Sequence, residues 1–512
     1  MRTQCTSLGK SSGEMSMRKV THEQLQIGEV DISQIKVDLQ SRDEIPKLLL
    51  GLQHIYCDLE LREQVFMTLE GLIPQEIDTT TGRPGMELWK ILVLGTLRVN
   101  CNWDYDKVQE IANNHRTLRL MLGHSSWEEP PYYYALQTLK DNLRLFTPEV
   151  LDQINQLVVQ AGHQVVGHPE GAALKGRCDS FVVETDVHYP TDINLLFDAI
   201  RKVLILITVV CANAGIPGWR QSQHNIRKIK KLFRKAQQLK RSKAKDPKKQ
   251  AARAQIIKDA HQAYLDLVAS FLGKVKQTLG LLRDGELASE DQLKVIEEYI
   301  SHAERQIAQI RRRVIKGEKI PHEEKVFSIF EEHTEWICKG KAGVSQELGL
   351  RVCILEDQYG FVLYHVVMQD QSDDAVAIPM VTATQARFST LSSCSFDKGF
   401  YTPDVREKLE EILATVILPK KGKLSEADRV RQSSEEFVQG RKQHSAVESG
   451  INALENHGLD RCTDHGLCGF QRYVALAVVA RNIQILGHIL QQNALKRQRR
   501  IEKIRRTRAK NA

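Results

Sequence analysis

The first third of the chain carries apolar residues at intervals of three and four, which is the pattern of amphipathic helices. Residues 43–72 (DEIPKLLLGLQHIYCDLELREQVFMTLEGL) and 85–123 (GMELWKILVLGTLRVNCNWDYDKVQEIANNHRTLRLMLG) show it, and the turn-rich segment DTTTGRPG separates them. We predict a helical N-terminal domain over residues 26–168, preceded by a polar, poorly ordered lead-in over residues 1–25. Short helices bearing Arg and His suit DNA binding, although a plain helical bundle would show the same pattern.

Beyond this region the pattern changes to short β-branched and aromatic runs, which indicate strands. GRCDSFVVET (176–185) is the first of them. LGLRVCILED (348–357) and GFVLYHVVMQD (360–370) are predicted to form an antiparallel hairpin. Two further strands are expected, one ending at Asp397 and one in ATVILPK (414–420).

Helical segments lie between and after these strands. The first, at 191–215, is expected to begin with Thr191 or Asp192 as its N-cap. Residues 219–318 are highly charged and helical, and they are interpreted as a helical hairpin inserted into the sheet domain.

Once this insertion is removed, the order of elements is that of a ribonuclease-H-like fold, a mixed five-stranded sheet with flanking helices. The predicted class is therefore α/β. The ribonuclease-H-like domain is expected to cover residues 169–490, with a basic helical insertion at 219–318. A basic C-terminal tail over residues 491–512 completes the chain.

Composition is that of a globular protein: of 512 residues, 42% are hydrophobic and 27% charged. The longest apolar run, Val203 to Gly215, is shorter than the roughly 20 residues that a membrane span requires, so it is interpreted as a core helix. No membrane anchor and no secretory signal are expected, which favours the cytoplasm. The segment CTDHGLC, Cys462 to Cys468, has zinc-ligand residue types but no second ligand pair nearby.

The formal charge of +8 is concentrated in two runs, 227–250 and 495–510. Dense basic runs attract polyanions and release their counterions, which gives affinity that depends on salt but not on sequence. A solvated helix face would look similar, and so would an RNA contact. We predict DNA as the partner, with the first run represented by the cations Arg227, Lys228, Lys230 and Lys231.

Two aspartates indicate the chemistry of the sheet domain. Asp397 ends a run of small and apolar residues, where a carboxylate is costly to bury unless a cation meets it. Asp179 lies in the first strand, which neighbours the strand of Asp397 in the predicted topology. Because two adjacent carboxylates repel each other, a divalent cation is expected between them.

The third acid is expected on the last helix of the domain. Ser433 and Glu436 have the spacing of a capping box at its start, and Gly458 marks its end. Its predicted buried stripe consists of Phe437, His444, Val447, Ile451 and Leu454. Glu448 borders this stripe, and Arg441, His444 and Glu455 share its side of the helix.

Hard oxygen ligands favour Mg²⁺ or Mn²⁺. Two such ions, roughly 3.5 to 4 Å apart, can activate the attacking oxygen and stabilise the leaving oxygen of a displacement at phosphorus. Asp179, Asp397 and Glu448 are therefore the predicted catalytic residues and metal ligands. Phosphoryl transfer requires little else of a protein beyond positioning and charge.

Three stretches resemble the catalytic motifs of bacterial insertion-sequence transposases of the DDE type, most closely the ISNCY group. They are DSFVVETDVHYPTDINLL, SFDKGFYTP and HSAVESGINALENHGLDRCTDHGLCGFQRYVALAVVARNIQILG, and GRPGMELWKILVLGTLR is similar to the N-terminal segment of such enzymes. The resemblance covers residues 40 to 490. It implies metal-dependent cleavage at transposon ends, attack of the freed 3′-hydroxyl on target DNA, and a homodimer on double-stranded DNA in the nucleoid.

Carried over by position, the triad of the family falls on Asp179, Asp397 and Glu448. Many relatives place Tyr, Arg and Lys at −7, −4 and +7 from the Glu, where this chain has Arg441, His444 and Glu455. Arg441 and His444 are the predicted phosphate contacts, and Glu455 competes with Glu448 for the role of third ligand.

Alternatives remain at each position and for the whole chain. Asp179 would be an ordinary strand-edge acid if it paired with Arg177 or Lys175, and Glu448 would be structural if it bridged to Arg441. Asp186 and Asp192 are nearby competitors, of which Asp192 is more simply a helix cap. The alternative functions are an inactive or domesticated DNA-binding protein and a stand-alone nuclease of the same fold.

Overall fold

The computed structural model describes residues 16–511 except 22–24, 26–27, 74–82, 126, 128–130, 242–246 and 339–345. Most of the predicted lead-in, most of the turn-rich segment and part of the first basic run fall outside the described residues. The chain divides into two compact units, one made of Met1–Asp186 with Ile337–Ala512 and the other of Val187–Trp336. The second unit contains the predicted insertion, but it begins before and ends after the expected limits of 219–318.

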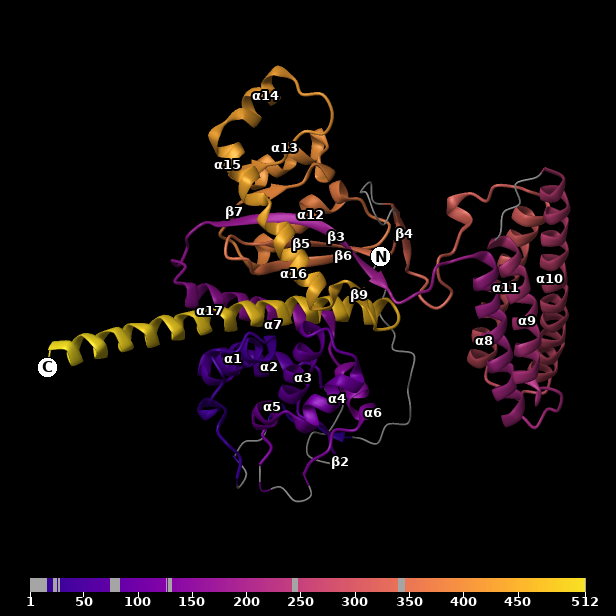
Figure 1. Ribbon diagram of the computed structural model, residues 1–512, viewed down its shortest axis with the longest axis horizontal. Helices are drawn as coiled ribbons and strands as arrows, with labels where there is room; N and C mark the ends of the chain where they lie inside the picture. Colours follow the sequence, from indigo (N-terminus) through magenta and orange to yellow (C-terminus); the bar gives the residue numbers. More distant parts are fainter. Residues whose placement is uncertain are drawn as a thin grey trace. The chain divides into compact units, whose positions relative to one another are not determined.

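A mixed seven-stranded sheet confirms the α/β class (Figure 1). Its strands are β3 (Leu174–Thr185), β4 (Glu335–Cys338), β5 (Gln346–Glu356), β6 (Val362–Met368), β7 (Leu391–Phe396), β8 (Thr415–Ile417) and β9 (Arg461–Cys462). The five predicted strands follow the order β6, β5, β3, β7, β8. β5 pairs with β6 and with β3 in the antiparallel sense, whereas β7 pairs with β3 and with β8 in the parallel sense. The short strands β4 and β9 make the sheet larger than predicted.

The helices before the sheet share its hydrophobic core. They are α1 (Glu44–Cys57), α2 (Leu59–Glu70), α3 (Leu88–Asn100), α4 (Tyr105–Asn114), α5 (Arg116–Met121), α6 (Leu136–Leu143) and α7 (Pro148–Val166), with η1 (Ile32–Gln34) and the two-residue strands β1 (Ser16–Met17) and β2 (Arg83–Pro84). Leu48 of α1, Leu92 of α3 and Val352 of β5 belong to one cluster of buried residues. The predicted boundary at residue 168 therefore does not separate two cores.

The long C-terminal helix α17 (Leu467–Asn511) joins the N-terminal helices to the sheet. A Cβ at Gly487 would lie 1.8 Å from Lys47 O, and one at Gly51 would lie 2.3 Å from Ile483 O, so two glycines allow α1 and α17 to approach closely. By length and composition α17 could cross a membrane, but 72% of its most apolar window is buried inside the protein. This burial is typical of a core helix in a soluble protein.

The second unit is a four-helix bundle rather than a hairpin. Its helices are α8 (Asp192–Asn213), α9 (Ser222–Arg241), α10 (Pro247–Asp284) and α11 (Glu290–Ile310), followed by η2 (Arg311–Ile315) and η3 (His322–Glu324). α8 contacts the other three helices and carries the apolar run predicted to be a core helix. Thr191 is its N-cap, accepting a hydrogen bond from Asn194 N at 3.3 Å, while Asp192 pairs with Arg313 at 2.7 Å.

The remaining helices of the first unit are α12 (Asp373–Arg387), α13 (Pro403–Ile412), α14 (Glu426–Ser433), α15 (Glu435–His444) and α16 (Ala446–Leu454), with the short turns η4 (Lys398–Phe400) and η5 (Glu455–Leu459). The predicted last helix is thus divided into α15 and α16 at Ser445. The predicted cap was wrong by one residue: Ser434 accepts the hydrogen bond of Phe437 N, and Glu436 accepts one from the Thr415 hydroxyl at 3.0 Å instead of completing a capping box. The predicted buried stripe is confirmed.

A buried ion-pair cluster occupies the segment considered for zinc. Asp464 lies 2.9 Å from Arg98 and 2.8 Å from Arg472. Burial opposes ionisation of the carboxyl, but the two guanidinium groups hold the pKa of Asp464 below its usual value. Asp464 is therefore a structural countercharge that ties α3 to the start of α17.

We expect Asp464→Asn to destabilise the protein by about 3–5 kcal/mol, because it leaves the Arg98 guanidinium buried beside a neutral amide. Arg98 is only 3% exposed. The measurement is the free energy of unfolding in urea. Asp404→Asn, which breaks the exposed pair with Lys408, is the control and should change stability far less. Equal losses in both variants would contradict the structural role of Asp464.

Candidate functional site

The parallel pairing of β3 with β7 brings two predicted site residues together. In this register Cys178 is opposite Phe396, and the next residue on each strand is Asp179 or Asp397. The two aspartates therefore follow a matched pair on adjacent strands. Asp397 caps η4 and is exposed, whereas Asp179 is half-buried. The expectation that Asp397 is buried was wrong, so the cost of desolvation falls on Asp179 instead.

Glu448 enters the same site from α16. This helix contacts β3 through its buried face, which includes Val447 and Ile451, and it leaves Glu448 exposed. The competing acid Glu455 lies two turns further on, at the C-cap of α16. Of these two acids, Glu448 is among the main charges that act on Asp179.

The pKa of Asp179 depends on its burial and on the charges of the other acids. Burial raises the pKa of Asp179 to about 6, and the negative charges of Asp397, Asp373 and Glu448 raise it too, against a lowering hydrogen bond from Ser180 N. Within the part of the chain that the structure describes, no salt bridge joins Asp179, Asp397 or Glu448 to a cation. The site is therefore a set of mutually repelling carboxylates.

The alternative partners proposed for Asp179 are not paired with it. The Arg177 side chain lies 3.0 Å from the Glu356 carboxylate and also donates to the carbonyl oxygen of Asp357. Glu356 is 2% exposed, and its burial raises its pKa to about 7 despite the lowering charge of Arg177. Arg177 thus neutralises a neighbouring buried acid and leaves Asp179 without a countercharge.

A fourth carboxylate, Asp373, borders the site and was missed by the sequence reasoning. Its Oδ1 accepts a hydrogen bond from the Ser180 hydroxyl at 2.7 Å and lies 3.9 Å from Arg351. A Cβ at Gly399 would lie 2.8 Å from its Oδ2. Asp373 therefore lies against residues close in the chain to both Asp179 and Asp397. Its position at the start of the helix after β6 was the available signal, but an acid in the first turn of a helix is ordinarily explained by the helix dipole alone.

The residues predicted to contact phosphate have different environments. His444 is buried, and its Nδ1 lies 3.0 Å from the Ser395 hydroxyl, so a direct contact with DNA is unfavourable there. Burial lowers the pKa of His444, opposed by the charge of Asp397. Arg441 is half-buried, and its Nη1 has no hydrogen-bond acceptor among the described residues. Arg441 is the better placed of the two to meet an anion.

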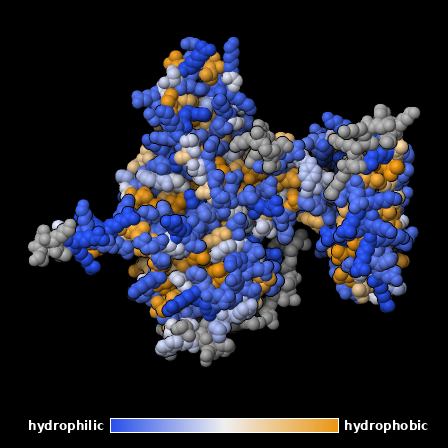
Figure 2. Space-filling model, viewed as in Figure 1, coloured by the Kyte–Doolittle hydropathy of each residue, from blue (hydrophilic) through white to orange (hydrophobic). Residues whose placement is uncertain are grey.

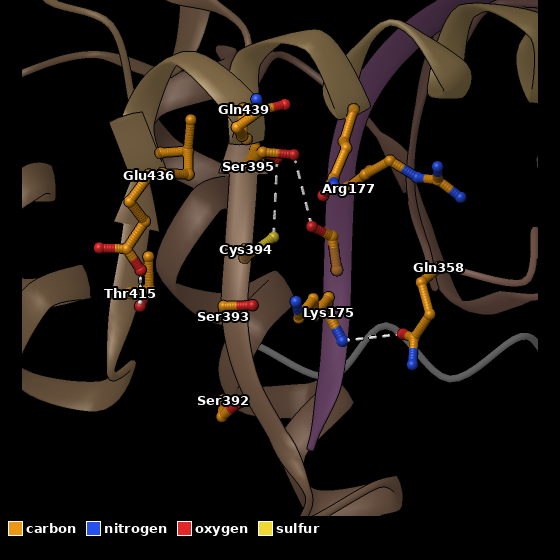
Figure 3. A pocket seen from close by; sticks show the side chains of 14 residues that line it. Lys175, Arg177, Gln358, Ser392, Ser393, Cys394, Ser395, Thr415, Glu436 and Gln439 are labelled. Carbon is orange, nitrogen blue, oxygen red and sulfur yellow. Dashed lines mark hydrogen bonds between the residues drawn. The ribbon is translucent and has the colours of Figure 1, made fainter. Parts of the chain in front are cut away.

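A polar cavity of about 700 Å³ begins two residues before the aspartates on both strands (Figure 3). Arg177 of β3 and Ser395 of β7 are among its lining residues, and Gln439 of α15 covers it. Figure 3 shows side chains from β3, β7 and α15 surrounding the same space. The hydroxyl, amide and charged groups of this lining suit a hydrated or anionic ligand.

The donor set suits a hard divalent cation, since it offers carboxylate oxygens that are open to solvent and repel one another. Among the described residues, no three His, Cys, Asp or Glu side chains lie close enough together to form a ready metal-binding group. The negative charges of these carboxylates repel one another, but the side chains are not arranged as a complete set of metal ligands. A bound cation would relieve this repulsion.

The predicted DNA-binding cations of the bundle lie on one exposed helix. Arg227, Lys228, Lys230 and Lys231 are all exposed on α9, and Ile226 and Ile229 between them are buried in the bundle. α9 is therefore amphipathic, with its charge facing solvent, which fits both the predicted DNA contact and the alternative of a solvated helix face.

Compared with protein-family models, curated proteins and solved structures, the chain has no significant match.

We expect Asp179→Asn to stabilise the metal-free protein at pH 8 by about 1–2 kcal/mol and to have little effect near pH 4. The pKa of Asp179 is raised in the folded protein to about 6, so the stability that its protonated form contributes is present below the usual carboxyl pKa and is lost as the pH rises through about 6. Asparagine cannot ionise and keeps that stability. Thermal unfolding in EDTA at both pH values is the measurement.

Asp186→Asn is the matched control, because Asp186 lies just after the same strand but pairs with Arg461 at 3.5 Å. It should not stabilise the protein at either pH. A lower melting temperature for Asp179→Asn at pH 8 would show that the repulsion inferred here is absent.

Proposed function

We propose that the chain is a transposase of the DDE type with a ribonuclease-H-like catalytic domain. The strand order β6, β5, β3, β7, β8, with its first two pairings antiparallel and its last two parallel, supports this fold assignment. Along the chain, the bundle is inserted between β3 and β5, which are the first two of these five strands in sequence order. The proposed reaction is metal-dependent cleavage at transposon ends, followed by transfer of the 3′-hydroxyl into target DNA.

One observation carries the proposal: the β3–β7 register sets Asp179 beside Asp397, and Glu448 of α16 acts on the same carboxyl. Acids so close together destabilise a protein unless a ligand uses them, which makes them candidates for a functional site. Asp179, Asp397 and Glu448 lie in three separate sequence stretches, and the effect of the last two charges on Asp179 supports their assignment to one site.

Asp179, Asp397 and Glu448 would hold Mg²⁺ or Mn²⁺, one or two ions, through carboxylate oxygens. When bound, such ions activate the attacking oxygen and stabilise the leaving oxygen at phosphorus. The protein's part is to position the acids on a rigid sheet and an adjoining helix. The charge of Arg441 acts on His444 together with those of Asp397 and Glu448, and positive charge near these acids favours a phosphate as the ligand. The exposed cations of α9 support contact with the DNA backbone.

Pairing two DNA ends requires two such sites, so the active form is proposed to be a homodimer on DNA. A cytoplasmic location with the nucleoid follows from the proposed substrate. The same site would serve a stand-alone nuclease, which would cut DNA without joining strands.

We expect Asp179→Asn, Asp397→Asn and Glu448→Gln each to reduce Mg²⁺-dependent nicking by at least about 100-fold, which corresponds to about 2.7 kcal/mol of transition-state stabilisation. The substrate is a supercoiled plasmid carrying the DNA that flanks the coding region on both sides. Binding to the same DNA in EDTA should change little, because the substitutions remove no positive charge.

Glu455→Gln is the control for the third acid and should nick as the wild type does. If it is inactive and Glu448→Gln is active, the third ligand is Glu455. Nicks without joined products would favour the nuclease, and wild-type nicking in all three variants would overturn the proposed function.

A further inference from the structure

The last third of α17 extends beyond the protein core. Among the residues of this helix whose burial is described, Gln491 is the last that is buried, and residues 496–507 are all exposed. Figure 1 shows the end of the helix projecting from the first unit as a continuation of the same rod. We call residues 496–507 the projecting end. The predicted C-terminal tail is therefore the extension of a core helix.

The projecting end is strongly cationic, and Figure 2 shows it as hydrophilic. Its cations are Lys496, Arg497, Arg499, Arg500, Lys503, Arg505 and Arg506, against the single acid Glu502. In the described part of the chain none of them forms a salt bridge. Because like charges three and four residues apart destabilise a helix, this segment gains stability from a polyanion laid along it.

The cations are concentrated on one face. Arg499 and Arg500 are adjacent, and Lys503 and Arg506 follow them at intervals of three or four residues, so all four lie on one side of the helix. Ile504, which is 46% exposed, borders this face, and Ile501, which is 45% exposed, lies on the opposite side of the helix. A linear array of fixed charge matches the regular phosphates of a nucleic acid duplex.

Two isoleucines are too few for the wide apolar face that an interfacial membrane helix needs. They are likewise too few for an extended coiled-coil seam with a second copy, which requires apolar residues over several heptads. Charge complementarity therefore favours duplex DNA as the occupant.

The helix also sets how far this face lies from the cavity next to Glu448. Ser449 and Gly450, next to Glu448, line one cavity together with Ile485 and His488 of α17. At about 1.5 Å per residue, the twelve residues from 488 to 500 span about 18 Å. Phosphates of one strand are about 3.4 Å apart along the duplex axis, so this span corresponds to about five base pairs.

We propose that the projecting end of α17 binds the phosphate backbone of duplex DNA, about five base pairs from the phosphate that is cleaved. The backbone contact stands on the exposed, unpaired charge of the helix. The stated distance rests on the proposed function, because it takes the carboxylates as the place of cleavage.

The contact is tested with the variant Arg499→Gln, Arg500→Gln, Lys503→Gln. Binding of the full chain to a 30-base-pair duplex of arbitrary sequence is measured in EDTA by fluorescence anisotropy at several salt concentrations. If all three residues contact phosphates, the slope of log affinity against log salt becomes less steep by about 2.7, at about 0.9 per contact. The melting temperature should stay unchanged, because these side chains pack against no described residue of the core.

The control carries Lys107→Gln, Lys408→Gln and Arg429→Gln, which remove the same net charge from exposed ion pairs elsewhere. Its slope should match the wild type. An unchanged slope in the first variant, or equal changes in both, would overturn the contact. Vesicles of phosphatidylcholine with one-fifth phosphatidylserine serve as the rival partner, and binding to vesicles without binding to the duplex would also overturn it.

The distance is tested by hydroxyl-radical footprinting on the plasmid ends. The variant should lose protection at phosphates about five base pairs from the nick made by the wild type, and loss elsewhere would overturn the distance. Failure of the proposed function is distinguishable: a reduced salt slope with no Mg²⁺-dependent nicking would support the contact while removing the catalytic assignment.

Discussion

The pairing of β3 with strands on both of its sides is the constraint on which the rest of the first unit depends. β5 pairs with it in the antiparallel sense from Arg177 to Glu184, and β7 pairs with its first half in the parallel sense. A shift of one residue in either register would turn Asp179 to the opposite face of the sheet and bury a charge in the core. The place of the aspartates is therefore set by the same contacts that form the core.

The protein neutralises its other buried acids but leaves this group alone. Asp464 has two arginines within 2.9 Å, and Glu356 has Arg177 at 3.0 Å. Asp179 is surrounded by acids and has no such partner in the described structure. Arginines neutralise Asp464 and Glu356, but none pairs with Asp179 in the described structure. This contrast favours a cation-binding role for Asp179 over a defect of packing.

Structural features that depend on residues close together in the chain could be predicted from the sequence. The strands, their order and the buried stripe around Glu448 follow from apolar runs and helical spacing, and Thr191 follows from cap chemistry. Features set by distant contacts could not. Ser434 replaces Ser433 as a cap because Glu436 is held by Thr415. Asp373 joins the site only because the fold places it beside Ser180, which no spacing in the sequence reveals.

The continuity of α17 could not be predicted for the same reason. A basic segment without apolar periodicity does not show whether it continues a helix. Its first part lies against α1, α3 and α7, and Gly487 and Gly51 bring the backbones of α17 and α1 together. Packing against the core therefore fixes the direction of the helix. The basic residues continue in that direction because the helix is unbroken. A flexible tail of the same composition would attract DNA equally well, but only a helix anchored in this way can hold its charge at a set distance from Glu448.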